Sequence, residues 1–312
     1  MENLVLSFNV VLPLFLMMLL GFGLKFIKLV DDSSLKILNN LVFRVFLPMM
    51  LFINVYRTNL KSVFNLKLTV FTILSLLFLY LALFIIIPIM EKDNKKRGVL
   101  IQAIYRSNFI IFGIPITISI IGEGQAGVTA LLSAFVIPLF NLLSVVALET
   151  FRGGKLNLKK AAKGIITNPL IIASFLGLFF LATGIKFPLI IEDTVSDIAG
   201  IATPLALVVM GGSFNFTAVK GNLKQISIGV IGKLVVVPLI FIPLSIFMGF
   251  QGAELVTLMI LFAAPTAVSS FTMAQQMGAD GDLACQLVVF DSTISIITIF
   301  FWVFTLKQMG FI

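Results

Sequence analysis

Two proline-centred segments of the chain carry the polar side chains best suited to binding a solute. The first runs from Ile104 to Pro115 and the second from Leu261 to Ser270. Proline lacks a backbone donor and clashes with the carbonyl four residues earlier, so each proline is expected to break an apolar helix. The half-helix that begins there would present free amides and the positive end of its dipole, which outlines an anion site. The candidate residues are Arg106, Asn108, Gly113, Ile114 and Pro115 in the first segment, and Ala264, Pro265, Thr266, Ser269 and Ser270 in the second.

A simple kink is the alternative interpretation of any one of these prolines, because proline is common in membrane helices. Two such segments, each flanked by Asn, Ser or Thr, favour a binding site instead. Broken backbone at membrane depth is tolerated only where it is buried in protein or lines a wet cavity.

Four charged side chains also lie within apolar segments, namely Arg44, Arg106, Lys233 and Asp291. Each is about nine to eleven residues from the expected cytoplasmic end of its segment, or about 13 to 16 Å at the rise of an α-helix. Such charges are rare and costly, so they indicate function or pairing. Arg44 and Lys233 are long enough to reach the interface instead. Two roles stay open for Arg106, attraction of an anion and an ion pair with Asp291.

The composition requires a bilayer as the solvent. Of 312 residues, 59% are hydrophobic and 12% are charged, which is more apolar surface than a water-soluble fold can bury. A membrane helix needs about 20 apolar residues. We therefore expect an all-α integral membrane fold of ten spans, near residues 5–27, 35–57, 66–90, 97–121, 126–149, 163–183, 190–212, 222–248, 252–277 and 283–306.

The residue inventory argues against an enzyme and against a cofactor. The chain contains no His, which excludes a Ser-His dyad and a His-ligated zinc site. Its one cysteine, Cys285, lies inside the last expected span and has no partner for a disulfide or a metal. The chain also lacks a Gly-rich nucleotide-binding loop. We expect no cofactor, no metal and no ATP-driven step.

The chain has a net charge of +8. Its basic residues lie mainly in connections between spans, which indicates the topology of the chain and not a nucleic-acid partner. Basic residues concentrate in alternate connections, which include the clusters Lys95-Lys96-Arg97 and Lys159-Lys160. The other connections keep few of them. Because basic loops stay in the cytoplasm, both termini are expected outside the cell membrane.

The chain also repeats itself at half its length. Three helix-punctuating residues recur at an offset of 156, as Pro13 with Pro169, Gly21 with Gly177, and Pro48 with Pro204. We expect two five-helix repeats, residues 1–155 and 156–312. Since five is odd, the second repeat is inverted, as in many secondary transporters with a midplane substrate site. Chance matches among prolines are the alternative.

These features resemble the auxin efflux carrier family, which includes plant auxin exporters and bacterial malonate and malate permeases. The resemblance covers nearly the whole chain. It rests on the ten spans, on Asn108 followed by Gly113-Ile114-Pro115, on the Glu149 to Arg152-Gly153 exit of span five, on the Asn168-Pro169 start of span six, and on proline-centred span nine, which ends at Ala274.

The resemblance implies that spans four and nine cross at Pro115 and Pro265, with a carboxylate bound at the crossing. It implies Asn108 as the polar anchor of the substrate. It also implies a homodimer in which spans one, two, six and seven form a scaffold and the remainder moves. Plant members have a glutamine in span five, and Asn141 is the nearest amide here. The short connection between spans five and six is similar to that of prokaryotic members.

The favoured function is a secondary carrier of a small mono- or dicarboxylate, similar to malate or malonate, that works by elevator-like alternating access. The alternative is a cation-coupled exchanger of related architecture, in which Asp291 would bind a proton or sodium. Such exchangers usually place more than one acid at the crossing, and spans four and nine have none at their centres.

Overall fold

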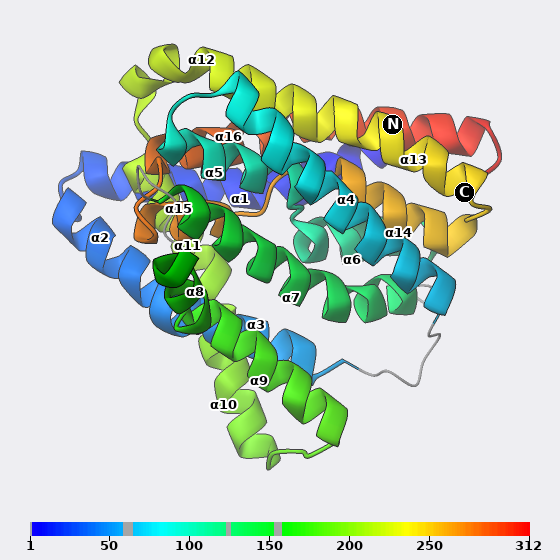
Figure 1. The fold of residues 1–312 in the computed structure, drawn as a ribbon, viewed down its shortest axis with the longest axis horizontal. Helices are drawn as coiled ribbons and strands as arrows, with labels where there is room; N and C mark the ends of the chain where they lie inside the picture. Colours follow the sequence, from blue (N-terminus) through cyan, green and yellow to red (C-terminus); the bar gives the residue numbers. More distant parts are fainter. Residues whose placement is uncertain (1, 59–64, 123–125, 153–157) are drawn as a thin grey trace.

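The computed structural model describes residues 2–58, 65–122, 126–152 and 158–312. Within these ranges the chain is helical and has no strand. The first half contains α1 (Glu2–Phe26), α2 (Asp32–Leu41), α3 (Leu47–Tyr56), α4 (Leu66–Met90), α5 (Asn94–Tyr105), α6 (Phe109–Ile121) and α7 (Ala126–Phe151). The second half contains α8 (Leu158–Ile166), α9 (Pro169–Thr183), α10 (Leu189–Gly200), α11 (Ala202–Ser213), α12 (Phe216–Ile231), α13 (Val237–Phe247), α14 (Gly252–Ala263), α15 (Ser269–Gln276) and α16 (Gly281–Gln308) (Figure 1).

Eight helical segments of the described chain are long and apolar enough to cross a bilayer. They coincide with the predicted spans one to five, seven, eight and ten. Two shorter apolar helices, α9 and α14, lie where spans six and nine are predicted. The prediction of an all-helical membrane fold is confirmed, with eight candidate membrane spans among the described residues. The total of ten spans stays a prediction.

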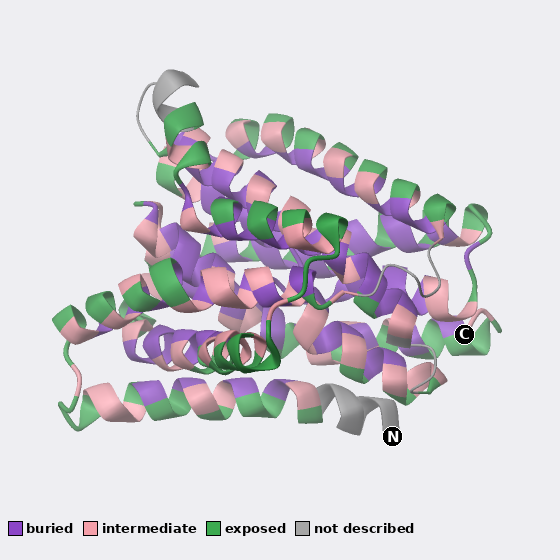
Figure 2. Ribbon diagram, turned by 90° about the horizontal axis from the view of Figure 1, so that it is seen from below, coloured by how far each residue is buried: buried purple, intermediate pink, exposed green. Residues whose placement is uncertain are grey.

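The outer surface of the bundle is apolar. Exposed residues lie along the outward sides of the peripheral helices, and buried residues lie between the helices (Figure 2). Many of the exposed side chains are large and apolar, for example Leu16, Leu74, Phe78, Phe175, Leu239 and Phe301. A water-soluble protein rarely exposes so much contiguous apolar surface, whereas lipid tails cover it without cost.

The fourth span is broken before its proline. Helix α5 ends at Tyr105, Arg106 has extended backbone angles of φ −86° and ψ 136°, and α6 begins at Phe109. Pro115 lies inside continuous α6, so the prediction that the chain opens there is wrong. A proline removes only one backbone hydrogen-bond donor, so a membrane helix can kink there and continue. Gly113 also lies within α6, at a close packing contact, because a Cβ there would lie 3.0 Å from Cγ2 of Thr129.

The ninth span is broken at its proline, as predicted. Residues 264–268, which include Pro265, separate α14 from α15. The two breaks meet, since the backbone N–H of Asn108 donates to the carbonyl oxygen of Pro265 at 2.8 Å. Both breaks are buried, with Ser107 and Thr266 each 3% exposed or less. Protein therefore surrounds the irregular backbone, as hydrocarbon requires.

Two helix pairs form the most extensive contacts between the first and second halves of the described chain. Helix α1 packs along α11, and α3 packs along α9. The first pair is especially close, because a Cβ on Gly21 would lie 1.9 Å from the carbonyl oxygen of Val208, and one on Gly211 would lie 1.9 Å from that of Met18. Small residues at such contacts let membrane helices approach backbone to backbone.

The Gly21→Ala variant is expected to lower stability by about 1 to 3 kcal/mol, because the added methyl group forces α1 and α11 apart. Thermal unfolding in detergent would measure the change. Gly23→Ala is the matched control on the same helix, since a Cβ on Gly23 would meet no atom within 4 Å. Equal unfolding temperatures for the two variants would contradict this account of the contact.

Candidate functional site

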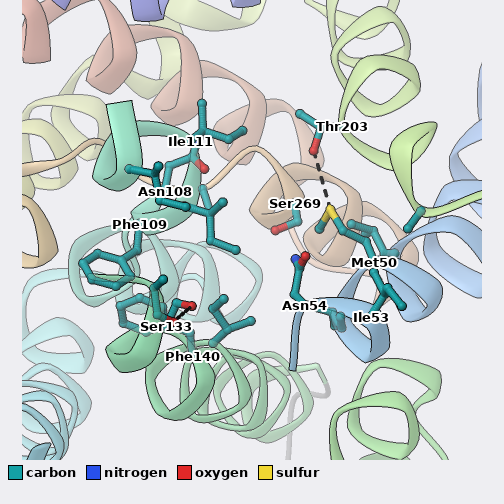
Figure 3. Close-up of a pocket in the computed structure, with 18 of the residues that line it drawn as sticks. Met50, Ile53, Asn54, Asn108, Phe109, Ile111, Ser133, Phe140, Thr203 and Ser269 are labelled. Atoms are coloured by element: carbon teal, nitrogen blue, oxygen red, sulfur yellow. Dashed lines mark hydrogen bonds between the residues drawn. The ribbon is translucent and has the colours of Figure 1, made fainter. Parts of the chain in front are cut away.

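A cavity of about 660 Å³ lies beside the crossing of the two broken spans. One wall comes from the break at Arg106–Asn108, the first residues of α6, and Ala267 to Ser269. The facing wall comes from α3, α10 and α11, and α7 contributes further residues (Figure 3). Most of the lining is apolar, with Met50, Ile53, Phe109, Ile111 and Phe140 among its members.

Arg106 is a buried charged residue that lines this cavity. Its side chain is 5% exposed and donates to Oγ of Ser269 at 2.7 Å, Oδ1 of Asn141 at 3.0 Å and Oγ of Ser144 at 3.3 Å. A further contact reaches Sδ of Met273 at 2.8 Å. All four acceptors are neutral. Among the described residues no carboxylate forms an ion pair with Arg106, so its positive charge is oriented but not neutralised.

Asn108 adds an unsatisfied amide to the same wall. Its side chain is 7% exposed, and its Nδ2 has no hydrogen-bond partner within the part of the chain that the structure describes. A buried amide without a partner costs free energy that a bound ligand or water can recover. Asn108 is also the N-cap residue of α6, so the positive end of that helix dipole lies at the cavity.

The second helix N-terminus at the cavity belongs to α15. Val268 and Ser269, the cap and first residue of this helix, both line the cavity. Two helix N-termini and the residues Arg106 and Asn108 therefore line a shared cavity. This arrangement favours a negatively charged ligand.

The structure brings together some of the predicted site residues and separates others. Arg106, Asn108, Ile114 and Ser269 line the cavity, and Asn141 reaches it through Arg106. The remaining predicted residues, Gly113, Pro115, Ala264, Pro265, Thr266 and Ser270, do not line it. The hydroxyls of Thr266 and Ser270 are buried and have no hydrogen-bond partner among the described residues.

The other intramembrane charges lie away from the cavity. Arg44 is exposed on η1 (Val42–Phe46), a π-helical turn between α2 and α3, which fits a side chain that reaches the interface. Lys233 lies on a second π-helical turn, η3 (Gly232–Val236), and Asp291 lies on α16. Both are fully buried. Among the described residues no ion pair joins Asp291 to Arg106 or to Lys233, so the pairing of Arg106 with Asp291 stays a prediction.

Three residues at the site were missed by sequence reasoning. Ser144 follows Asn141 by three residues on α7, so helical spacing alone could have placed the two side chains on one face. Met273 follows Ser269 by four residues on α15 and reaches Arg106 in the same way. Asn54 of α3 lines the opposite wall, and its polar character within an apolar span was the available signal.

Exposed Arg57 and Gly200 line the cavity, where Arg57 donates to Oε1 of Glu192 at 2.7 Å and to Oγ of Ser196 at 2.9 Å. Outside the cavity lining, fully buried Asn39 of α2 donates to Oε1 of Gln275 of α15 at 2.5 Å.

An all-helical bundle with an apolar outer surface, two broken helices that meet at a backbone hydrogen bond, and a cavity beside them is typical of an integral membrane transporter. The chain belongs to the family described as "Membrane transport protein", whose family model matches residues 6–303. Membership in the auxin efflux carrier family, predicted from the motifs, is thereby confirmed.

Three relatives align with this chain over nearly the full length of both proteins. An uncharacterized transporter of Methanocaldococcus jannaschii is 24% identical over 94% of this chain and 97% of its own. One from Methanothermobacter thermautotrophicus is 22% identical over 95% of this chain and 97% of its own. A protein of Rhizobium meliloti described as "Putative malonate transporter" is 24% identical over 93% of both chains. The family and these relatives are transporters, which agrees with the expectation that the chain is not an enzyme.

If Lys233 and Asp291 form a buried charge pair, the Asp291→Asn variant is expected to lose about 3 kcal/mol of stability, because Lys233 would stay buried without a counter-charge. Lys233→Met should cost a similar amount for the converse reason. The double variant should recover most of the loss, since it removes both charges. Thermal unfolding of the four proteins in detergent would measure this, and additive losses in the double variant would exclude the pairing.

Proposed function

We propose that this protein is a secondary transporter that carries a small organic anion, a mono- or dicarboxylate, across the cell membrane. The proposal includes ten spans in two inverted repeats, residues 1–155 and 156–312, with both termini outside. It also includes a homodimer whose scaffold is spans one, two, six and seven. The Rhizobium meliloti relative, by its description, supports a malonate-like substrate.

The observation that carries the proposal is the bonding of Arg106. A buried guanidinium normally has a carboxylate partner, because an uncompensated charge in low dielectric is costly. Here its partners are two hydroxyls, an amide oxygen and a thioether, and it lines a cavity. A substrate carboxylate would supply the missing negative charge, and the free amide of Asn108 and the two helix N-termini would add donors.

The lining charges favour an anion carrier over the cation-coupled exchanger. Among the described residues, the charged side chains that line the cavity are Arg57 and Arg106, and both are cations. Asp291, the residue on which the exchanger depends, does not line the cavity.

Helix packing supports the inverted repeat. Gly21 of α1 and Gly177 of α9 are related by the offset of 156, and they occupy comparable contacts. Gly21 approaches the backbone of α11, and a Cβ on Gly177 would lie 3.1 Å from the carbonyl oxygen of Phe52 in α3. Span one thus packs on span seven as span six packs on span two. Breaks in the fourth and ninth spans complete the correspondence.

Two polar positions support alternating access. Arg57, which belongs to a connection expected outside, lines the cavity, and the buried Asn39 to Gln275 hydrogen bond, outside the cavity lining, would close the path to the other side. This bond joins α2 of the expected scaffold to α15 of the expected moving part. Exchange of the open and closed sides would carry a bound anion across the membrane.

Uptake into liposomes tests the function directly. Purified protein would be reconstituted and offered labelled mono- and dicarboxylates, with and without proton and sodium gradients. Saturable uptake of a carboxylate would support the proposal. Uptake of cations alone, or exchange that ignores every carboxylate, would overturn it.

The Arg106→Gln variant is expected to weaken substrate binding by about 1 to 3 kcal/mol, and dianions more than monoanions, because attraction scales with ligand charge. Binding to detergent-solubilised protein would measure the change. Arg44→Gln is the control, since it removes an exposed cation of the same type. Equal weakening by both variants would assign the effect to net charge and not to the site.

The Asn39→Ala variant is expected to shift the protein away from the state described, because it removes the buried bond that would close the path to the other side. A cysteine in place of Ile110, which lines the cavity, would report the shift in a Cys285→Ser background. Its labelling by an impermeant reagent from outside should slow. Asn40→Ala, at the next position on α2, should leave labelling unchanged, and an unchanged rate in Asn39→Ala would contradict the proposal of a closing bond.

A further inference from the structure

The two walls of the cavity differ in polarity. The wall at the crossing contains Arg106, Ser107, Asn108 and Ser269, whereas α3 contributes a largely apolar stripe. Leu47, Met50, Leu51 and Asn54 of this stripe recur at the three- and four-residue spacing of one helix face. Asn54 is the polar member of this face within the helix. Its side chain points into the cavity, toward the side on which Ser269 lies (Figure 3).

The other polar groups of the α3, α10 and α11 wall are already engaged. Arg57 donates to Glu192 and Ser196. The hydroxyl of Thr203 donates to Sδ of Met50 at 3.7 Å, and that of Thr58 donates to the backbone carbonyl of Asn54 at 3.0 Å. For the carboxamide of Asn54, by contrast, no hydrogen bond to another described residue is formed. Its two donors and its acceptor oxygen remain available to a ligand.

From this geometry we infer that Asn54 is a specificity-determining residue that hydrogen-bonds a second polar group of the substrate. The inference rests on the proposed function and narrows its substrate class. Arg106 and Asn108 would hold one carboxylate, while Asn54 faces the opposite part of the ligand. The substrate is then a carboxylate with a second oxygen group, a hydroxyl, oxo or carboxyl group, and not one with an unsubstituted hydrocarbon tail.

A polar group in a binding site discriminates between ligands more strongly than an apolar wall does. An apolar wall discriminates poorly between ligands that differ by one oxygen, whereas a wall with an amide rejects the ligand that leaves the amide without a partner. A polar side chain within an apolar span is also costly to keep, so its position at a cavity indicates use. One hydrogen bond of this kind corresponds to about a tenfold difference in affinity.

The experiment compares two ligands of equal chain length, succinate and butyrate, in binding to the purified protein. Wild-type protein should prefer succinate. In Asn54→Leu the affinity for succinate should fall about tenfold while that for butyrate is unchanged or rises. Asn54→Gln, which keeps the amide, should retain part of the preference and guards against a folding defect. Asn40→Leu, the same change on α2 outside the cavity lining, should bind as wild type does.

Malate, which carries a hydroxyl group, and 2-oxoglutarate, which carries an oxo group, would then distinguish the kinds of second oxygen group. The affinity for each ligand should fall in Asn54→Leu if that group bonds to the Asn54 amide. Equal loss for succinate and butyrate, or no loss for either, would overturn the role of Asn54 while leaving the anion carrier intact. Failure of the wild-type protein to bind any carboxylate would overturn the proposed function and the inference together.

Discussion

Hydrocarbon offers no partner to a peptide group, and this constraint determines where the chain can depart from a helix. The two departures described, at Arg106–Asn108 and at residues 264–268, lie against each other deep in the bundle. The Asn108 to Pro265 backbone hydrogen bond satisfies one group from each. The surrounding spans shield both breaks from lipid. The cavity, the helix N-termini and the polar side chains at the crossing all follow from this single arrangement.

The same constraint explains how the bundle treats its buried charges. Lys233 and Asp291 are both fully buried, and neither lines the cavity. Arg106 is buried too, but it is bonded only to neutral groups and borders the cavity. A buried charge that borders a cavity and has no carboxylate partner is a candidate ligand group. A buried charge away from the cavity is not within reach of a solute. This contrast makes the anion-carrier proposal more economical than a cation exchanger.

The sequence predicted the membrane class and the ends of most spans because hydropathy reports burial in lipid directly. It located the second break because Pro265 lies within it. It misplaced the first, since a proline at 115 can sit inside a helix, whereas the break at Asn108 is fixed by a contact with a distant residue. It also left two roles open for Arg106, and no ion pair joins Arg106 to Asp291 among the described residues. Depth along a span can be read from sequence, but the direction in which a helix face points cannot.

The position of Arg106 has an electrical consequence. Its charge is attached to the segment that also holds the proposed substrate site. If that segment crosses the membrane field, the empty carrier moves one positive charge, whereas the carrier with a monoanion moves none. A potential of 100 mV is equivalent to about 2.3 kcal/mol for one charge. With a monoanion as substrate, voltage would then act on the return of the empty protein only. With a dianion, the loaded protein would carry one negative charge, so voltage would act on both steps.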